Sequence, residues 1–136
     1  MFEIFEHTAD VGIRARAETP DALFSEAARG LFSVMVSRLD DVRPIETVEF
    51  HLPGDHLEEL LHDWLSELLF TFGTRRLLFC EFQTRIGPDG LTASARGEPF
   101  DPSRHALGDE VKAITWHALK VERSADGWTA EVIVDV

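Results

Sequence analysis

The clearest pattern in the chain is a stripe of apolar residues between positions 57 and 72. Spacings of three and four residues place the stripe on one side of an α-helix, so we expect it to form core rather than a cofactor site. Asp55 and Glu58 have the spacing of a capping box, which predicts Asp55 as the N-cap. Gly73 is expected to end the helix. The stripe consists of Leu57, Leu60, Leu61, Trp64, Leu65, Leu68, Leu69 and Phe72.

A second helix is predicted to begin at Thr19. Thr19 suits the N-cap, Pro20 the first helical position and Asp21 the first turn. The helix should end near Ser37, before the polar residues Asp40 and Asp41. Its expected buried face carries Leu23, Phe24, Ala27, Ala28, Leu31, Phe32 and Met35.

The remaining regular segments alternate between apolar and polar residues, which indicates half-buried strands. We expect strands over 2–5, 11–17, 47–52, 77–86, 91–95 and 128–134. Val111–Val121 alternates in the same way and predicts a further strand, on which Lys112 and His117 would point to opposite faces. A helix over 109–117 is the alternative interpretation of that segment.

Several strands with two amphipathic helices predict an α+β fold. We expect a two-layer arrangement, in which both helices pack on one face of a single mixed, largely antiparallel β-sheet. The 136 residues are enough for one domain with a proper core. No repeat, linker or low-complexity segment divides them, so we expect a single domain over 1–136.

Composition limits the partners that this domain can have. The net charge is −12, from 13 basic and 25 acidic residues. This balance argues against direct binding of nucleic acid and favours a cation or a basic protein surface, although the charge also serves solubility. The lone Cys80 is expected to be a small buried residue rather than a nucleophile. With no apolar run of 18 residues and no leader, we expect a cytoplasmic protein without a membrane span.

Two carboxylates near the ends of the chain are candidate metal ligands. Asp10 precedes the second predicted strand, and Asp135 lies beside Val136 after the last one. If the terminal strands are neighbours, these oxygens could converge on a hard cation such as Ca²⁺ or Mg²⁺, with His7 as a third ligand. The competing interpretation is that the carboxylates are solvated and that His7 is a surface or cap residue.

The Gly- and Pro-punctuated segment from Gly97 to His117 carries eight chargeable side chains, two of them histidines. Such loops often carry functional sites. Glu98, Asp101, Arg104 and His105 form a candidate acid–base cluster. The alternative is a loop held by local salt bridges and Asx turns. No Gly-rich phosphate loop, CxxC or HExxH motif is present.

Four stretches, in order along the chain and with similar spacing, together resemble the archease family. Trp116 stands where that family usually has Tyr. The four stretches are His7-Thr8-Ala9-Asp10, Gly97-Glu98 with Asp101 and Arg104-His105, Glu110-Val111-Lys112-Ala113 with Thr115 and His117, and Val134-Asp135-Val136.

The resemblance implies an accessory protein, not an enzyme. The implied partner is an RtcB-type RNA ligase, which guanylylates its own histidine with GTP and Mn²⁺ and joins RNA ends in tRNA splicing and RNA repair. The implied role is to speed guanylylation and allow repeated turnover. The resemblance places a metal on Asp10 and Asp135, with Val136 as a further ligand. The residues that it implies as contacts with the ligase are Glu98, Asp101, Arg104, His105, Lys112 and His117.

Two other functions stay open at this point. The first is a stand-alone metal-dependent hydrolase that uses Glu98, Asp101 and His105. The second is a chaperone-like binding module without a metal.

Overall fold

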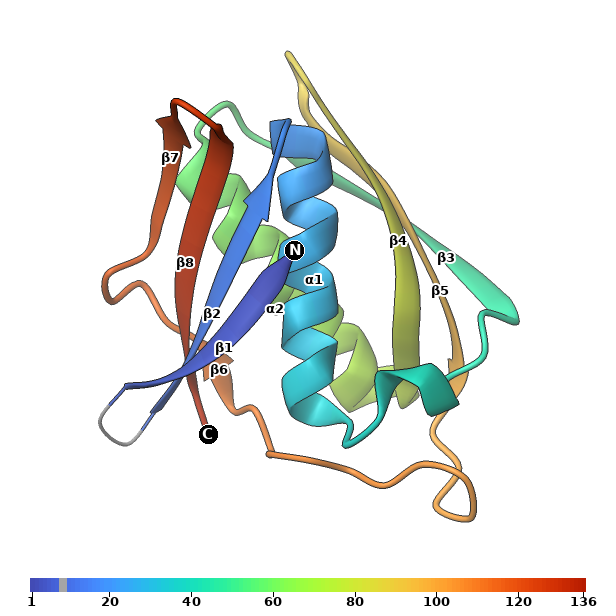
Figure 1. Ribbon diagram of the computed structural model, residues 1–136. Helices are drawn as coiled ribbons and strands as arrows, with labels where there is room; N and C mark the ends of the chain where they lie inside the picture. Colours follow the sequence, from blue (N-terminus) through green and yellow to red (C-terminus); the bar gives the residue numbers. More distant parts are fainter. Residues whose placement is uncertain (8–9) are drawn as a thin grey trace.

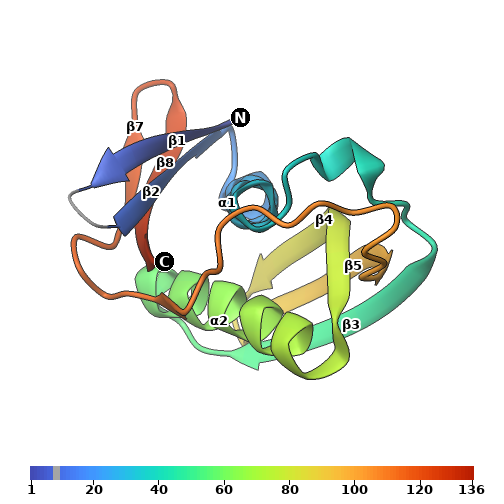
Figure 2. The same ribbon diagram turned by 90° about the horizontal axis from the view of Figure 1, so that it is seen from below.

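Two antiparallel β-sheets with two helices between them form the fold of this computed structural model, which describes residues 1–7 and 10–136 (Figure 1, Figure 2). In the larger sheet the order is β1-β2-β8, with β6 and β7 both paired to β8; the smaller sheet has the order β3-β5-β4. The larger sheet consists of β1 (Phe2–His7), β2 (Asp10–Ala17), β6 (Ala113–Ile114), β7 (Lys120–Ser124) and β8 (Gly127–Asp135). The smaller sheet consists of β3 (Glu46–Pro53), β4 (Leu77–Gly87) and β5 (Gly90–Pro99).

The α+β class is confirmed, but the single mixed sheet with both helices on one face is wrong. Every strand pair is antiparallel, and the strands divide into two sheets. Helix α1 (Pro20–Met35) contacts β2 of the larger sheet and β4 of the smaller one. Helix α2 (Leu57–Arg75) lies beside it, contacting β6 and the smaller sheet (Figure 2). Each sheet therefore buries one face against a shared helical layer.

The two helices begin and end partly as predicted. Thr19 caps α1, because its hydroxyl accepts a hydrogen bond from the Ala22 N–H at 3.1 Å. The predicted Asp55 cap is wrong, since α2 begins at Leu57 without a side-chain cap. Gly73 does not end α2, which continues to Arg75. No helix in residues 1–7 and 10–136 is long and apolar enough to cross a membrane.

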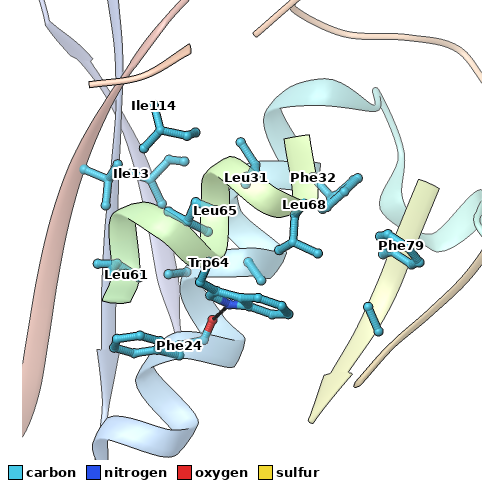
Figure 3. Close-up of a cluster of buried hydrophobic side chains, with 14 of the residues drawn as sticks. Ile13, Phe24, Leu31, Phe32, Leu61, Trp64, Leu65, Leu68, Phe79 and Ile114 are labelled. Atoms are coloured by element: carbon cyan, nitrogen blue, oxygen red, sulfur yellow. Dashed lines mark hydrogen bonds between the residues drawn. The ribbon is translucent and has the colours of Figure 1, made fainter. Parts of the chain in front are cut away.

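The predicted apolar stripe of α2 packs into the core between the sheets (Figure 3). Trp64 is fully buried, and its indole N–H donates a hydrogen bond to the Phe24 carbonyl of α1 at 3.1 Å. The Phe50 ring of β3 meets the Trp64 ring edge-on, with 5.3 Å between centroids. Trp64 therefore joins both helices to the smaller sheet.

The predicted strand over Val111–Val121 is interrupted, and the helical alternative is also wrong. Only Ala113–Ile114 pairs with β8 before the chain leaves the sheet and returns at Lys120. Ala118 has a φ of 53°, which turns the backbone in this interval. The Trp116 ring stacks on the His62 ring of α2 at 3.8 Å. Alternation in sequence could not reveal this stack, because His62 lies 54 residues away.

Candidate functional site

The larger sheet brings together the two ends of the chain that carry the candidate metal ligands. In the antiparallel pairing of β2 with β8, Val11 lies opposite Val134, so Asp10 and Asp135 stand side by side where the two strands end. The Lys112 N–H donates a hydrogen bond to the Asp135 carbonyl at 2.7 Å. The last strand, β8, therefore has the second strand, β2, as its neighbour, and not the first strand, β1.

The donors at this end suit a hard cation. Asp10 and Asp135 are half-buried, and neither side chain has a hydrogen bond or ion pair with another described residue. No group of three or more His, Cys, Asp or Glu side chains in the described chain is placed to hold a metal. A complete ligand set would therefore need main-chain oxygens, such as those of Val136, or water. Such an oxygen-only set fits Ca²⁺ or Mg²⁺.

The predicted motif around Asp10 is only partly described. Thr8 and Ala9 lie outside the described residues, and so does the side chain of His7. The main chain of His7 pairs with Asp10 across β1 and β2. The expectation that His7 serves as a third ligand stays a prediction.

A second cluster is built around Glu98, a carboxylate near the end of β5 that is only 3% exposed. The Arg43 N–H donates to it at 2.8 Å, and the Arg43 side chain at 3.2 Å. Arg104 donates to the same carboxylate, and His105 Nε2 lies 2.9 Å from it. Each carboxylate oxygen is thus held by several donors, as a buried charge requires.

The hydrogen bonds around His105 define its tautomer. The Asp101 N–H donates to His105 Nδ1 at 2.9 Å, so Nε2 carries the proton and donates to Glu98. Asp101 Oδ1 accepts from the Ser103 N–H at 2.9 Å and from the Ser103 hydroxyl at 2.8 Å, an Asx turn. These bonds match the predicted alternative of a loop held by local salt bridges and Asx turns.

The partner contacts predicted for this segment divide into two groups. Glu98 and His105 are each only 3% exposed, and their hydrogen bonds with each other and with Arg104 hold the loop in position. Contact of these two residues with a partner also stays a prediction. Lys112 and His117 are exposed, and Arg104 and Asp101 keep part of their side chains at the surface. For these four residues, contact with a partner stays a prediction.

Residues 106–112, which we call the strap, run from this cluster to the end of β8. The Gly108 N–H donates to the Met35 carbonyl and the Asp109 N–H to the Val34 carbonyl, both at 2.9 Å. A Cβ on Gly108 would lie 2.5 Å from the Val34 carbonyl oxygen, so only glycine fits this close approach. The strap is therefore fixed to the C-terminal end of α1.

Arg43 is a contributor to the site that the sequence did not indicate. It lies 55 residues before Glu98 and comes after the short 3₁₀ helix Leu39–Asp41. Nothing in the sequence around Arg43 separates it from any other surface arginine.

Arg76, at the C-terminal end of α2, is another residue that the sequence did not indicate. It has a φ of 55°, and its guanidinium lies 4.4 Å from the centroid of the Phe72 ring.

The environment of Glu98 gives its carboxyl an unusual acidity. Burial favours the neutral form, but the hydrogen bonds from Arg104, Arg43 and His105 outweigh it. They lower the pKa of Glu98 from an ordinary value near 4.5 to about 2. The carboxylate is therefore ionised at neutral pH and is poorly suited to act as a general acid or base.

We expect the Glu98 cluster to stabilise the fold only above acidic pH. Because the pKa is lower in the folded state, the stabilisation is complete above about pH 4.5 and is lost as the pH falls to about 2. Glu98→Gln should lower the free energy of unfolding at pH 7 by about 3 kcal/mol. Urea unfolding of both proteins from pH 7 to pH 2 measures this difference, which should shrink on acidification. A difference independent of pH, or as large in the exposed control Glu49→Gln, would contradict the assignment.

Comparison with known proteins places the chain among described archeases. Residues 2–136 match the archease protein family. The chain is 45% identical to the archease of Methanopyrus kandleri, covering 99% of each chain, and 41% identical to that of Pyrococcus furiosus, covering 100% of this chain and 99% of the relative.

Two solved structures are similar to the fold. The solution structure of protein 1598 from Methanobacterium thermoautotrophicum has a TM-score of 0.88 and 35% identity, covering 99% of this chain and 98% of that one. A crystal structure from Thermotoga maritima, described as an archease and possible chaperone, has a TM-score of 0.69 and 22% identity, with coverage of 100% and 98%. At that identity, the second likeness shows the fold alone.

Proposed function

Because this chain belongs to the archease family, we propose that it is a metal-binding activator of an RtcB-type RNA ligase. In this role it promotes guanylylation of the ligase and multiple turnover in tRNA splicing or RNA repair. The observation that carries the proposal is the β2–β8 register, which sets Asp10 beside Asp135 at one end of the sheet. Two carboxylates held together without a described ionic partner favour binding of a cation.

In this proposal Asp10, Asp135 and main-chain oxygens of Val136 hold Ca²⁺ or Mg²⁺. A bound cation supplies a fixed positive charge at an acidic end of the molecule. Lys112 lies beside the same end, because its N–H is bonded to the Asp135 carbonyl. Its exposed ammonium group is then available to a carboxylate or phosphate of the ligase complex.

The charge of the chain supports a protein partner with a basic surface. A net charge of −12 favours approach to a ligase surface that binds RNA, and it disfavours RNA as a direct ligand. The strap is a fixed element beside the Asp10–Asp135 end, which suits a rigid contact. The proposed binding face therefore comprises this end and the strap.

We propose that the protein has no catalytic activity of its own. Glu98 and His105 are buried and hydrogen-bonded to each other. Burial, followed by the nearby charges of Glu81 and Glu98, raises the pKa of the Cys80 thiol to about 11, so it is not a thiolate at neutral pH. We expect no nuclease, ligase or phosphatase turnover by the purified protein. Turnover of a phosphate ester that disappears in Glu98→Gln would instead support the hydrolase.

A chaperone-like binding module is the second candidate. The observations that favour it are two large side chains at the surface, Phe70 at 63% and Trp116 at 57% exposure. An aggregation assay with an unrelated heat-denatured protein separates the two candidates. A ligase activator should not suppress aggregation at equimolar concentration, whereas a general chaperone should.

Multiple-turnover ligation tests the proposal. A cognate ligase is kept limiting over an RNA with 3′-phosphate and 5′-hydroxyl ends, with GTP and Mn²⁺. We expect ligation to continue through many cycles when this protein is present and to stall after roughly one cycle when it is absent. The protein should be loaded with Ca²⁺ or Mg²⁺ and desalted before the assay, so that its proposed site is filled and no chelator removes Mn²⁺ from the ligase. An equal number of cycles with and without the protein would refute the proposal.

A further inference from the structure

A cleft of about 380 Å³ lies between β1, the C-terminal end of α1 and the strap. Figure 1 shows the strap passing the C-terminal end of α1. The apolar walls of the cleft include Ile4, Val11 and Val34. Glu6 and Asp109 are its titratable lining residues, and both are exposed.

Three separate features make this cleft electronegative. Glu6 faces it from β1, where its main chain pairs with Val11. Asp109 faces it from the strap, where its N–H is fixed to the Val34 carbonyl. The C-terminal end of α1, a 16-residue helix without a basic residue in its last turn, adds a weaker negative potential, because the Val34 and Met35 carbonyls already accept hydrogen bonds from the strap.

The charges of the two acids are not neutralised within the described chain. Neither Glu6 nor Asp109 forms an ion pair with another described residue, and no lysine or arginine lines the cleft. An acid beside a helix C-terminus is unfavourable in isolation. A cation in the cleft would relieve the repulsion among all three features.

We propose that the cleft receives a lysine or arginine side chain of a protein partner. The apolar walls suit the aliphatic stem of such a side chain, and the two carboxylates and the helix end suit its charged head. A hydrated divalent cation would use the carboxylates but gain nothing from Ile4, Val11 and Val34. This site uses neither Asp10 nor Asp135, and its occupation requires no metal.

The proposal goes beyond ligase activation, because it can be tested without a ligase. Amide chemical shifts of the metal-free, isotope-labelled protein are followed by NMR during titration with N-acetyl-arginine methylamide. N-acetyl-norleucine methylamide is the matched probe, with a similar stem but no charge. We expect the arginine amide to shift the amides of Glu6, Val11 and Asp109 saturably, and the norleucine amide to leave them nearly unchanged.

Variants assign the binding to these two acids. The double variant Glu6→Gln, Asp109→Asn should weaken arginine-amide binding about tenfold, since each exposed charge pair contributes modestly. Glu49→Gln on β3 is the control and should bind as the parent does. Asp10→Asn, Asp135→Asn should also retain binding, so a failure of the metal proposal leaves this one standing.

Three outcomes would overturn the inference. The two amides could shift the same resonances equally, which would mean that charge is not recognised. The arginine amide could act only at resonances outside the cleft. Ca²⁺ could shift the amides of Glu6, Val11 and Asp109 while the arginine amide does not, which would make the cleft a cation site instead of a side-chain site.

Discussion

Replacing both Asp10 and Asp135 with asparagine should abolish ligase activation while leaving the melting temperature close to that of the parent. Neither side chain has an ionic partner in the described chain, and half-exposed carboxylates contribute little to folding. Stability comes instead from the core between the sheets, centred on Trp64 and its neighbours. Asparagine keeps the size of the side chain and removes the negative charge that a hard cation needs.

A metal that only braces the chain ends would give a different result. Asp10→Ala would then lower the melting temperature and the ligase activation in proportion. Multiple-turnover ligation and a melting curve, measured for each variant, separate the two cases. Glu49→Gln is the control, because it also removes a negative charge but lies on a remote strand, β3. Full activation by the folded double variant would remove the metal from the account. The mechanism would then depend on the strap, with Lys112→Ala as the next variant.

Gly97→Ala should destabilise the fold by more than about 4 kcal/mol, enough to unfold a marginally stable domain. A Cβ at this position would lie 1.8 Å from the Leu78 carbonyl oxygen and 2.7 Å from the Phe79 Cα. Both are backbone atoms of β4, beside the irregular register between Phe79 and Glu81, so no side chain can move aside. The strand pair would separate immediately before Glu98, and the buried cluster would lose its position.

Gly73→Ala is the matched control for that substitution. Gly73 lies in α2, and apart from its chain neighbours and the backbone of its own helix, no atom lies within 4 Å of the position its Cβ would occupy. The same chemical change should therefore stabilise the protein by about 0.5–1 kcal/mol, through helix propensity. Chemical unfolding of both variants measures the contrast. Equal destabilisation by the two would show that close backbone approach at Gly97 is not the cause.

Elements with a strong local pattern could be predicted from the sequence. The stripe of α2 and the Thr19 cap of α1 depend on residues within a few positions of one another. Strands β4 and β5 could be predicted for the same reason, since the alternation of apolar and polar residues in each lies within a few adjacent positions. Periodicity is local and holds in any tertiary arrangement, whereas capping is less secure, since the predicted Asp55 cap does not form.

Features that depend on distant contacts could not be predicted in the same way. Alternation shows that a strand is half-buried, but it does not say which sheet the strand joins, and the division into two sheets was therefore missed. The interruption near Trp116 depends on the His62 ring of α2. The Glu98 cluster depends on Arg43, whose side chain is 61% exposed and typical of a surface residue.

The candidate metal site shows what residue spacing and family resemblance could each predict. Spacing alone left Asp10 and Asp135 as solvated acids or as ligands, since they are 125 positions apart in the chain. The family resemblance named them together, and the β2–β8 register then set them side by side. The burial of Glu98 and His105 was not visible in a loop rich in Gly and Pro.

The fraction of ligase that carries covalent GMP is the most direct measure of the central claim. A cognate ligase is incubated with radiolabelled GTP and Mn²⁺, without RNA, and the labelled ligase is quantified over time. We predict that catalytic amounts of this protein speed the labelling many-fold, and that the protein with Asp10→Asn and Asp135→Asn leaves it at the rate of the ligase alone. Labelling at the same rate with and without the parent protein would contradict the account.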